Sequence, residues 1–206
     1  MLKIKTIVSG QIKVNCYIVY DSETLSAIII DPGEEGDKVI SEIQKDSLKP
    51  EMLLNTHSHF DHIYSDEQIR QYFKIPLGAH TQSIGILSDP QKNGSAFFSS
   101  PISVQKPDIL FNDNQIIELK WTKFQVIHTP GHTKDSVCFL FDGFLITGDT
   151  LFAGDIGRTD LEGGSYGEII NSLRKIKKLD PSLIIYPGHE ESSILSYELK
   201  NNKYLQ

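Results

Sequence analysis

Residues 56–62 read Thr-His-Ser-His-Phe-Asp-His, and the interpretation of the whole chain starts from this stretch. Four side chains that can bind a metal fall within six residues: His57, His59, Asp61 and His62. Imidazole suits zinc and iron, and a carboxylate adds a harder, charged ligand. Histidines two residues apart need an extended or turning backbone, because neighbours on one helical face are three or four residues apart. The stretch therefore predicts a metal site.

The flanking residues place this site between a strand and a helix. The apolar run 52–55 predicts a short buried strand, and Ser65 with Gln68 three residues later is a capping-box pattern that opens a helix. Ile69, Tyr72 and Phe73 are expected on the inner face of that helix. Loops held by a rigid scaffold are a usual place for catalytic groups.

Three later stretches add further ligand-type side chains. Residues 128–133, 147–150 and 186–189 each follow an apolar run that predicts a strand. Because each stretch lies where a strand gives way to a loop, all of them can meet at one sheet edge. The candidate metal ligands are then His57, His59, Asp61, His62, His132, Asp149 and His189.

The remaining pattern predicts strands and then helices, twice over. Strands are expected at 2–8, 13–20, 27–30, 76–80, 116–119, 124–127, 137–141, 144–146 and 183–186, and helices at 37–45, after 65, after 165 and from about 193. The segment 88–108 is rich in Ser, Pro, Asn and Gly and is expected to be a long surface loop that forms one wall of the pocket. We expect one domain over residues 1–206, with two sheets packed together and helices outside.

Composition limits the class of protein. The chain has 206 residues and a formal net charge of −7, which argues against a nucleic-acid partner because phosphate binding needs a basic face. Cys16 and Cys138 both lie in apolar strand-like runs, so two buried free thiols are expected rather than a disulfide. No signal-peptide pattern or membrane-span pattern is present, and we expect a cytoplasmic protein without membrane contact.

Taken together, the motifs resemble the metallo-β-lactamase fold, and specifically the short, single-domain hydrolases similar to glyoxalase II. The resemblance rests on residues 56–62, His-Thr-Pro-Gly-His-Thr at 128–133, Thr-Gly-Asp-Thr-Leu-Phe at 147–152, Ile-Gly-Arg-Thr-Asp at 156–160 and Tyr-Pro-Gly-His at 186–189, with Asn-Cys-Tyr at 15–17 and Ile-Asp-Pro-Gly at 30–33. It implies an α/β protein with an αββα sandwich and a binuclear metal site at one edge of the two sheets.

The resemblance also assigns the ligands. His57, His59 and His132 would hold the first metal, Asp61, His62 and His189 would hold the second, and Asp149 would bridge both. His128 matches a position that is not a ligand in the family, and His80 has no motif around it and is expected to be structural.

Two divalent metals, zinc first with iron or manganese as alternatives, would leave a net positive centre that polarises a carbonyl. Coordination lowers the pKa of water enough to give a metal-bridging hydroxide at neutral pH. Asp61 would orient this hydroxide and accept its proton, so Asp61 is the expected catalytic residue. No Ser or Cys nucleophile is required.

The chain departs from the family pattern in ways that concern the substrate. Glyoxalase II proper carries a C-terminal helical domain that contributes to glutathione recognition, whereas this chain ends seventeen residues after His189. Asp155, Glu190 and Glu191 add negative charge near the expected site. Arg158 has two readings: it binds a substrate carboxylate, or it pairs with Asp160 and braces the loop.

The expected function is therefore hydrolysis of a small thioester similar to S-lactoylglutathione by a monomer or homodimer. The alternative is a mononuclear iron persulfide dioxygenase of the same fold, whose relatives share the Gly-Arg-Thr-Asp run. Those relatives usually have Pro-Ala-His where this chain has Pro-Gly-His at 187–189, so the hydrolase is favoured. A purely structural metal site is disfavoured, because structural zinc usually has four closed protein ligands.

Overall fold

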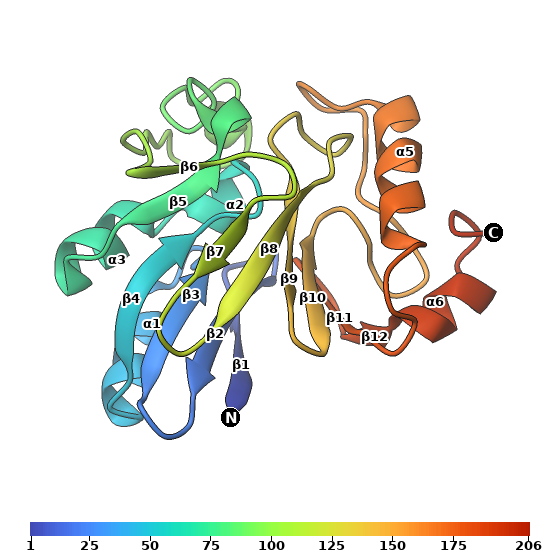
Figure 1. The fold of residues 1–206 in the computed structure, drawn as a ribbon. Helices are drawn as coiled ribbons and strands as arrows, with labels where there is room; N and C mark the ends of the chain where they lie inside the picture. Colours follow the sequence, from blue (N-terminus) through green and yellow to red (C-terminus); the bar gives the residue numbers. More distant parts are fainter. The chain divides into compact units, whose positions relative to one another are not determined.

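In a computed structural model, which describes residues 1–206, the chain forms two mixed six-stranded sheets, shown in Figure 1. The chain divides into two compact units. The first consists of residues 1–111 and 119–122, and the second of residues 112–118 and 123–206. Each unit contains one of the sheets.

The first unit has the strand order β1-β2-β3-β4-β5-β6. β1 to β3 are antiparallel, and β3 to β6 are parallel. Its elements are β1 (Leu2–Ser9), β2 (Val14–Asp21), β3 (Ser26–Ile30), α1 (Gly36–Lys45), β4 (Lys49–Leu54), α2 (Phe60–Ile63), α3 (Asp66–Phe73), β5 (Leu77–His80), a 3₁₀ turn (Thr81–Ser83), α4 (Ser95–Phe98) and β6 (Ile109–Phe111). Parallel neighbours need crossover connections, and α1 and α3 supply two of them.

One face of the first sheet and these two helices share a core. The helix α1 presents Val39, Ile40 and Ile43 to it at helical spacing. Strand residues of a single face, including Ile18 and Ile29, belong to the same buried cluster. Each fully buried aliphatic side chain contributes about 1.5–3 kcal/mol relative to an exposed one, so this cluster holds β3 and β4 in place.

The second unit has the strand order β12-β11-β10-β9-β8-β7. Only β10 and β11 are parallel. Its elements are β7 (Ile116–Glu118), β8 (Lys123–His128), β9 (Val137–Phe141), β10 (Phe144–Gly148), α5 (Tyr166–Ile176), β11 (Ile184–Pro187), β12 (Ser193–Ile194) and α6 (Leu195–Asn201). The parallel pair again has a helix, α5, as its crossover.

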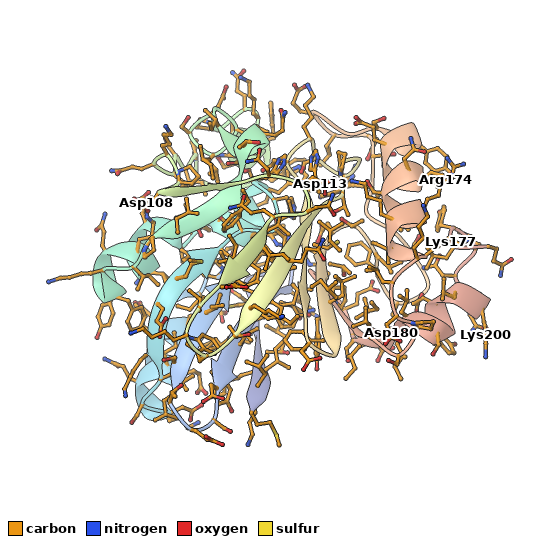
Figure 2. The ribbon with its side chains drawn as sticks, in the orientation of Figure 1. Asp108, Asp113, Arg174, Lys177, Asp180 and Lys200 are labelled. Carbon is orange, nitrogen blue, oxygen red and sulfur yellow. The ribbon has the colours of Figure 1, made fainter.

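The helix α5 is amphipathic, as its sequence predicts. Leu173 and Ile176 are buried in a cluster with strand residues such as Leu145 and Ile185. On the opposite face, Arg174 and Lys177 are exposed, as Figure 2 shows. Ser165 caps the helix, because its hydroxyl accepts a hydrogen bond from the amide of Glu168.

Several sequence predictions need correction at this level. Ser65 stands at the N-cap of α3 but makes no capping hydrogen bond, and Gln68 instead donates to Asp37 on α1. Tyr72 is not inward-facing, because 52% of it is exposed. The segment 88–108, expected to be a loop, contains the short helix α4, and the strand β6 begins directly after residue 108. These elements are shorter than the windows in which periodicity is visible.

The two cysteines are buried and unpaired, as predicted. Burial raises the pKa of the Cys138 thiol to about 11, although hydrogen bonds from the Thr129 and Thr150 hydroxyls oppose the shift. Burial raises the pKa of the Cys16 thiol further. No helix combines the length and the apolar character needed to cross a membrane.

Asp66 is an unusual acid in the first unit, because it is fully buried at the start of α3. One of its oxygens accepts a hydrogen bond from the Asn55 side chain at 3.2 Å, and the other has no partner. Burial raises the pKa of Asp66 well above its ordinary value. The folded protein therefore binds a proton at Asp66 more tightly than the unfolded chain does.

This difference makes stability fall as pH rises from about 4, the unfolded pKa, up to the folded pKa of Asp66. Asp66→Asn removes the titrating group but keeps the shape. Relative to the wild type, the free energy of unfolding of the variant should increase as pH rises through that window, by at most about 1.4 kcal/mol per pH unit. Below the window, the difference between the two proteins should not change with pH. Urea unfolding of chelator-treated protein at several pH values measures this. A pH-independent difference would show that Asp66 titrates normally.

Candidate metal centre

The predicted ligands of the first unit lie on one short segment. It begins where β4 ends at Leu54 and runs through α2. His57 and His59 precede the helix, whereas Asp61 and His62 lie inside it. The rings of His57 and His59 meet edge to face with centroids 4.9 Å apart, and those of His57 and His62 are 4.2 Å apart. All four side chains are buried.

The carboxylate of Asp31, at the end of β3, organises this segment. It accepts hydrogen bonds from the amide of Thr56 at 2.8 Å and from the hydroxyl of Thr56 at 2.6 Å. It also pairs with Nδ1 of His62 at 3.0 Å. Because a carboxylate only accepts, Nδ1 of His62 carries the proton and Nε2 presents its lone pair.

His57 is oriented by the same group through Thr56. The Thr56 hydroxyl donates to Asp31, so its oxygen is left to accept from Nδ1 of His57, 3.1 Å away. Nε2 of His57 is then the nitrogen available to a metal. Asp31 itself has a φ of +50°, a left-handed conformation that Asp tolerates better than most residues.

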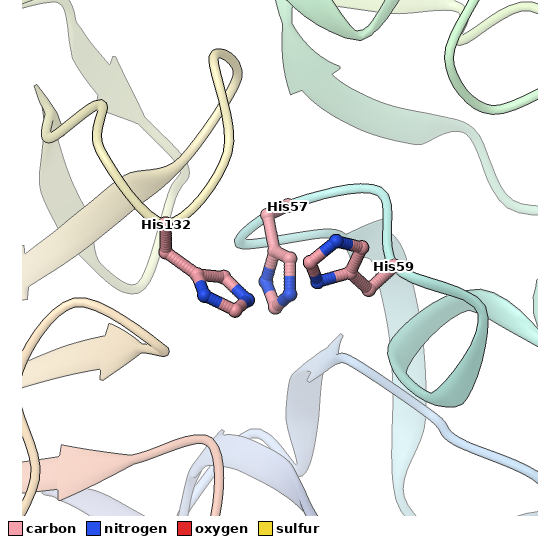
Figure 3. A group of neighbouring side chains, drawn as sticks. All are labelled: His57, His59 and His132. Atoms are coloured by element: carbon pink, nitrogen blue, oxygen red, sulfur yellow. The ribbon is translucent and has the colours of Figure 1, made fainter. Parts of the chain in front are cut away.

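The predicted ligands of the second unit follow three different strands. His132 comes after β8, Asp149 directly after β10, and His189 after β11. Oδ2 of Asp149 lies 3.4 Å from Nε2 of His132 and 3.6 Å from Nε2 of His189. Figure 3 draws His132 on its loop, together with His57 and His59 on the loop after β4.

These spacings test whether the side chains fit a metal. Nε2 of His62 and Oδ2 of Asp61 are 3.7 Å apart, so this pair and both pairs of Asp149 are longer than a good hydrogen bond. Two ligands about 2.0–2.2 Å from one tetrahedral zinc lie about 3.3–3.6 Å from each other. The donor types and their spacing therefore fit divalent metals. Each of the seven predicted ligands is among the side chains that could hold a metal ion.

His132 is oriented by a backbone group that the sequence did not reveal. Its Nδ1 lies 2.8 Å from the carbonyl oxygen of Arg158, which fixes Nε2 as the metal-binding nitrogen. This contact needs glycine at position 157. A Cβ there would overlap the carbonyl oxygen of Asp149 and lie 3.1 Å from Nδ1 of His132. The Gly-Arg-Thr-Asp run thus orients His132 through a backbone carbonyl oxygen, and its glycine allows the chain to pass close to Asp149.

The helix α6 holds the loop that leads to Gly157 and Arg158. Glu198 is fully buried, and its carboxylate accepts hydrogen bonds from the amide of Gly154 at 2.8 Å and from the side chain of Asn202 at 3.1 Å. Asn202 also donates to the carbonyl oxygen of Asp155. The sequence pointed to the exposed acids Glu190 and Glu191 as charges near the site, whereas no motif marked the buried acid Glu198.

The other predicted positions are placed as follows. The guanidinium of Arg158 pairs with both carboxylate oxygens of Asp160, at 2.7 and 2.8 Å. Nδ1 of His80 accepts from the amide of Gln82 and caps a 3₁₀ turn. Nε2 of His128 lies 2.8 Å from the carbonyl oxygen of Lys134. These contacts support structural roles for both histidines.

Comparison with known proteins places the chain in context. Residues 9–189 match the metallo-beta-lactamase superfamily. The hydroxyacylglutathione hydrolase GloC of Haemophilus influenzae is 34% identical over 196 residues, which cover 93% of this chain and 92% of that protein. The solved structure of BLEG-1 B3 metallo-beta-lactamase is 35% identical with a TM-score of 0.95, and covers 99% of this chain and 100% of that one. The structure of TTHA1623 in a di-iron-bound form is 28% identical with a TM-score of 0.88, and covers 98% and 100%.

These matches confirm the predicted fold class, the metallo-β-lactamase fold. The two mixed sheets and the few helices agree with an αββα sandwich. The matched residues 9–189 extend over both units, so the units are parts of one family fold.

We expect Asp31→Asn to weaken metal binding about 10–100-fold, because the neutral amide no longer fixes His62 and Thr56. Competition of the folded variant with a chromophoric chelator measures the affinity. Asp113→Asn is the matched control, since Asp113 accepts from the His128 amide and from Lys175 and touches no predicted ligand. Equal affinities of wild type and Asp31→Asn would remove the orienting role.

Gly157→Ala should displace the loop that carries the Arg158 carbonyl and so lower the metal content of purified protein at least severalfold. Gly167→Ala is the control, because a Cβ at Gly167 meets nothing within 4 Å. Elemental analysis of both variants, with circular dichroism to verify folding, makes the comparison. A fully loaded Gly157→Ala protein would contradict the close approach described above.

Proposed function

Because the chain belongs to the metallo-β-lactamase superfamily, we propose that it is a binuclear metallohydrolase that cleaves a small thioester similar to S-lactoylglutathione. Members of the superfamily are metal-dependent hydrolases, and that coarser class holds for this chain. The observation that carries the finer proposal is the set of buried and half-buried imidazoles and carboxylates, with Nδ1 of His57, His62 and His132 each occupied by a defined partner. The identity to GloC of Haemophilus influenzae supports the choice of a thioester.

As part of this proposal, the seven predicted ligands would hold two metals. His57, His59 and His132 would hold one metal, Asp61, His62 and His189 would hold the other, and Asp149 would serve as a ligand to both. The pairing of Oδ2 of Asp149 with both His132 and His189 supports the bridging role. Zinc is proposed first because imidazole and carboxylate suit it, and iron and manganese are the alternatives. TTHA1623 is a relative in di-iron form.

When bound, the divalent metals supply Lewis acidity toward the thioester carbonyl and lower the pKa of water, so that water attacks at neutral pH. Asp61, buried beside His62, orients the water and accepts its proton. Water adds to the acyl carbon, the carbon–sulfur bond breaks, and the sulfur takes up the proton that Asp61 received. The acid and the thiol are the products.

Arg158 is assigned to bracing rather than to substrate binding. Its guanidinium already forms a bidentate pair with Asp160, so a substrate carboxylate would have to displace that partner. The two buried free thiols are compatible with the reducing cytoplasm, where we place this activity.

A second candidate, hydrolysis of a β-lactam amide, is favoured by the similarity to BLEG-1 B3 metallo-beta-lactamase. Both reactions transfer an acyl group to water and need the same polarised carbonyl. A thiolate is a better leaving group than an amide nitrogen, and this keeps the thioester first.

The test is elemental analysis of protein purified without added metal, followed by assays on S-lactoylglutathione, on a chromogenic cephalosporin and on glutathione persulfide. Two metals per chain with thioester cleavage support the proposal. One iron per chain with oxygen uptake on the persulfide would establish the dioxygenase instead, and faster cephalosporin cleavage would establish the lactamase.

Asp149→Ala should lose metal from both positions and lower kcat/KM for the thioester by at least about a thousandfold, because a bridging ligand serves both ions. Asp113→Asn, at a carboxylate that touches no predicted ligand, is the control and should retain both metals. Two metals and near-normal turnover in Asp149→Ala would eliminate the bridging assignment.

A further inference from the structure

We propose that Phe97 and Phe98 form an apolar platform that binds the acyl chain of the substrate, so that the enzyme prefers thioesters of longer apolar acids. This inference rests on the proposed thioesterase function and names the substrate class for it. The platform is defined as the exposed side chains of Phe97 and Phe98 on α4 together with the ring of Phe60 on which Phe98 stacks.

Both phenylalanines are unusually exposed. Phe97 is 70% exposed and Phe98 is 60% exposed, on a helix of four residues. Burying each ring would be favourable, and the fold leaves that free energy unused. Adjacent exposed aromatic side chains of this kind mark ligand or partner surfaces more often than isolated apolar residues do.

The platform is continuous with the metal-ligand segment. The rings of Phe98 and Phe60 are stacked, with centroids 6.0 Å apart and an interplanar angle of 14°. Phe60 stands between the predicted ligands His59 and Asp61 in the sequence. Its amide donates a hydrogen bond of 2.9 Å to the carbonyl oxygen of Asn93, which ties the segment before α4 directly to the ligands.

Hydrogen bonds hold the residues that flank the platform, although it lies in a long connection. Asn93 is fully buried, and its side chain donates to the carbonyl oxygens of Leu87 and Ile102 and accepts from the amide of Ser95. The Ser95 hydroxyl accepts from the amide of Ile102. A surface that is ordered before binding loses less entropy when a ligand arrives.

The charge of this segment favours an apolar ligand over an anionic one. Between residues 88 and 103 the only cation is Lys92, and it is paired with Asp89 at 3.4 Å. The carboxylates of a glutathione moiety therefore find no available cation on the platform. An aliphatic acyl chain needs none, and it gains by covering the aromatic rings.

The experiment compares acetyl, butyryl and hexanoyl thioesters of one thiol on the metal-loaded enzyme. In the wild type, kcat/KM should rise about two- to fourfold for each added methylene. In the double variant Phe97→Ser and Phe98→Ser, the ratio of hexanoyl to acetyl kcat/KM should fall to near one. Phe98→Leu keeps an apolar surface and should retain most of the ratio. Tyr72→Ala, which removes a 52% exposed aromatic residue on α3, is the matched control and should leave the ratio unchanged.

A hexanoyl-to-acetyl ratio that is the same in the wild type and the double variant overturns the platform. A second series of thioesters keeps the acyl group and lengthens the thiol. If kcat/KM rises with thiol length rather than with acyl length, the platform is also overturned. Sedimentation velocity adds a third outcome: a wild-type dimer that the double variant abolishes, with no change in chain-length preference, would make the two phenylalanines an interface between copies of the chain.

A binding measurement separates this inference from the thioesterase proposal. Ketones in which a methylene replaces the thioester sulfur cannot be hydrolysed, and calorimetry gives their affinity for the metal-loaded protein. If no thioester is cleaved but the affinity rises with acyl length only in the wild type, the thioesterase proposal fails and the platform stands. If thioesters are cleaved and neither rate nor affinity depends on acyl length, the platform fails alone.

Discussion

The buried carboxylate of Asp31 is the constraint on which the predicted centre most depends. It stands at the end of β3 and fixes the backbone and hydroxyl of Thr56 and the ring of His62. Through Thr56 it also sets the proton on His57. A single charge in the interior is costly unless it is fully hydrogen-bonded, and here the partners that offset the cost are the groups that must be oriented. The same hydrogen bonds thus stabilise the fold and orient the predicted ligands.

The second unit orients its predicted ligand His132 with a backbone carbonyl oxygen rather than with a side-chain carboxylate. The Arg158 carbonyl orients His132, glycine at 157 allows the close approach, and the carboxylate of Glu198 holds the loop from α6. The two designs respond differently to change. A substitution at Asp31 removes specific partners, whereas a substitution in the 152–158 loop acts by moving the chain.

Much of this arrangement is predictable from the sequence, for identifiable reasons. The candidate ligands could be named because His and Asp cluster at strand ends in motifs with fixed spacing, and the main strands and helices followed from apolar periodicity. In the sequence, Asp31 stood only in the Ile-Asp-Pro-Gly motif, and its orienting role was not visible because it accepts hydrogen bonds from residues 25 and 31 positions away. The buried acids Asp66 and Glu198 look like surface residues in the sequence, and α4 is too short for periodicity to show.

The burial of the two thiols affects how sensitive the protein is to oxidation. Peroxides attack the thiolate and not the thiol, and a raised pKa keeps Cys16 and Cys138 almost wholly in the unreactive form. Because the proposed chemistry uses no sulfur nucleophile, neither thiol has to be exposed or ionised for the reaction. No cysteine takes part in the proposed chemistry, so oxidation of a thiol does not remove a reacting group. Such an enzyme can keep working in an oxidant-stressed cell in which cysteine-dependent hydrolases are being silenced.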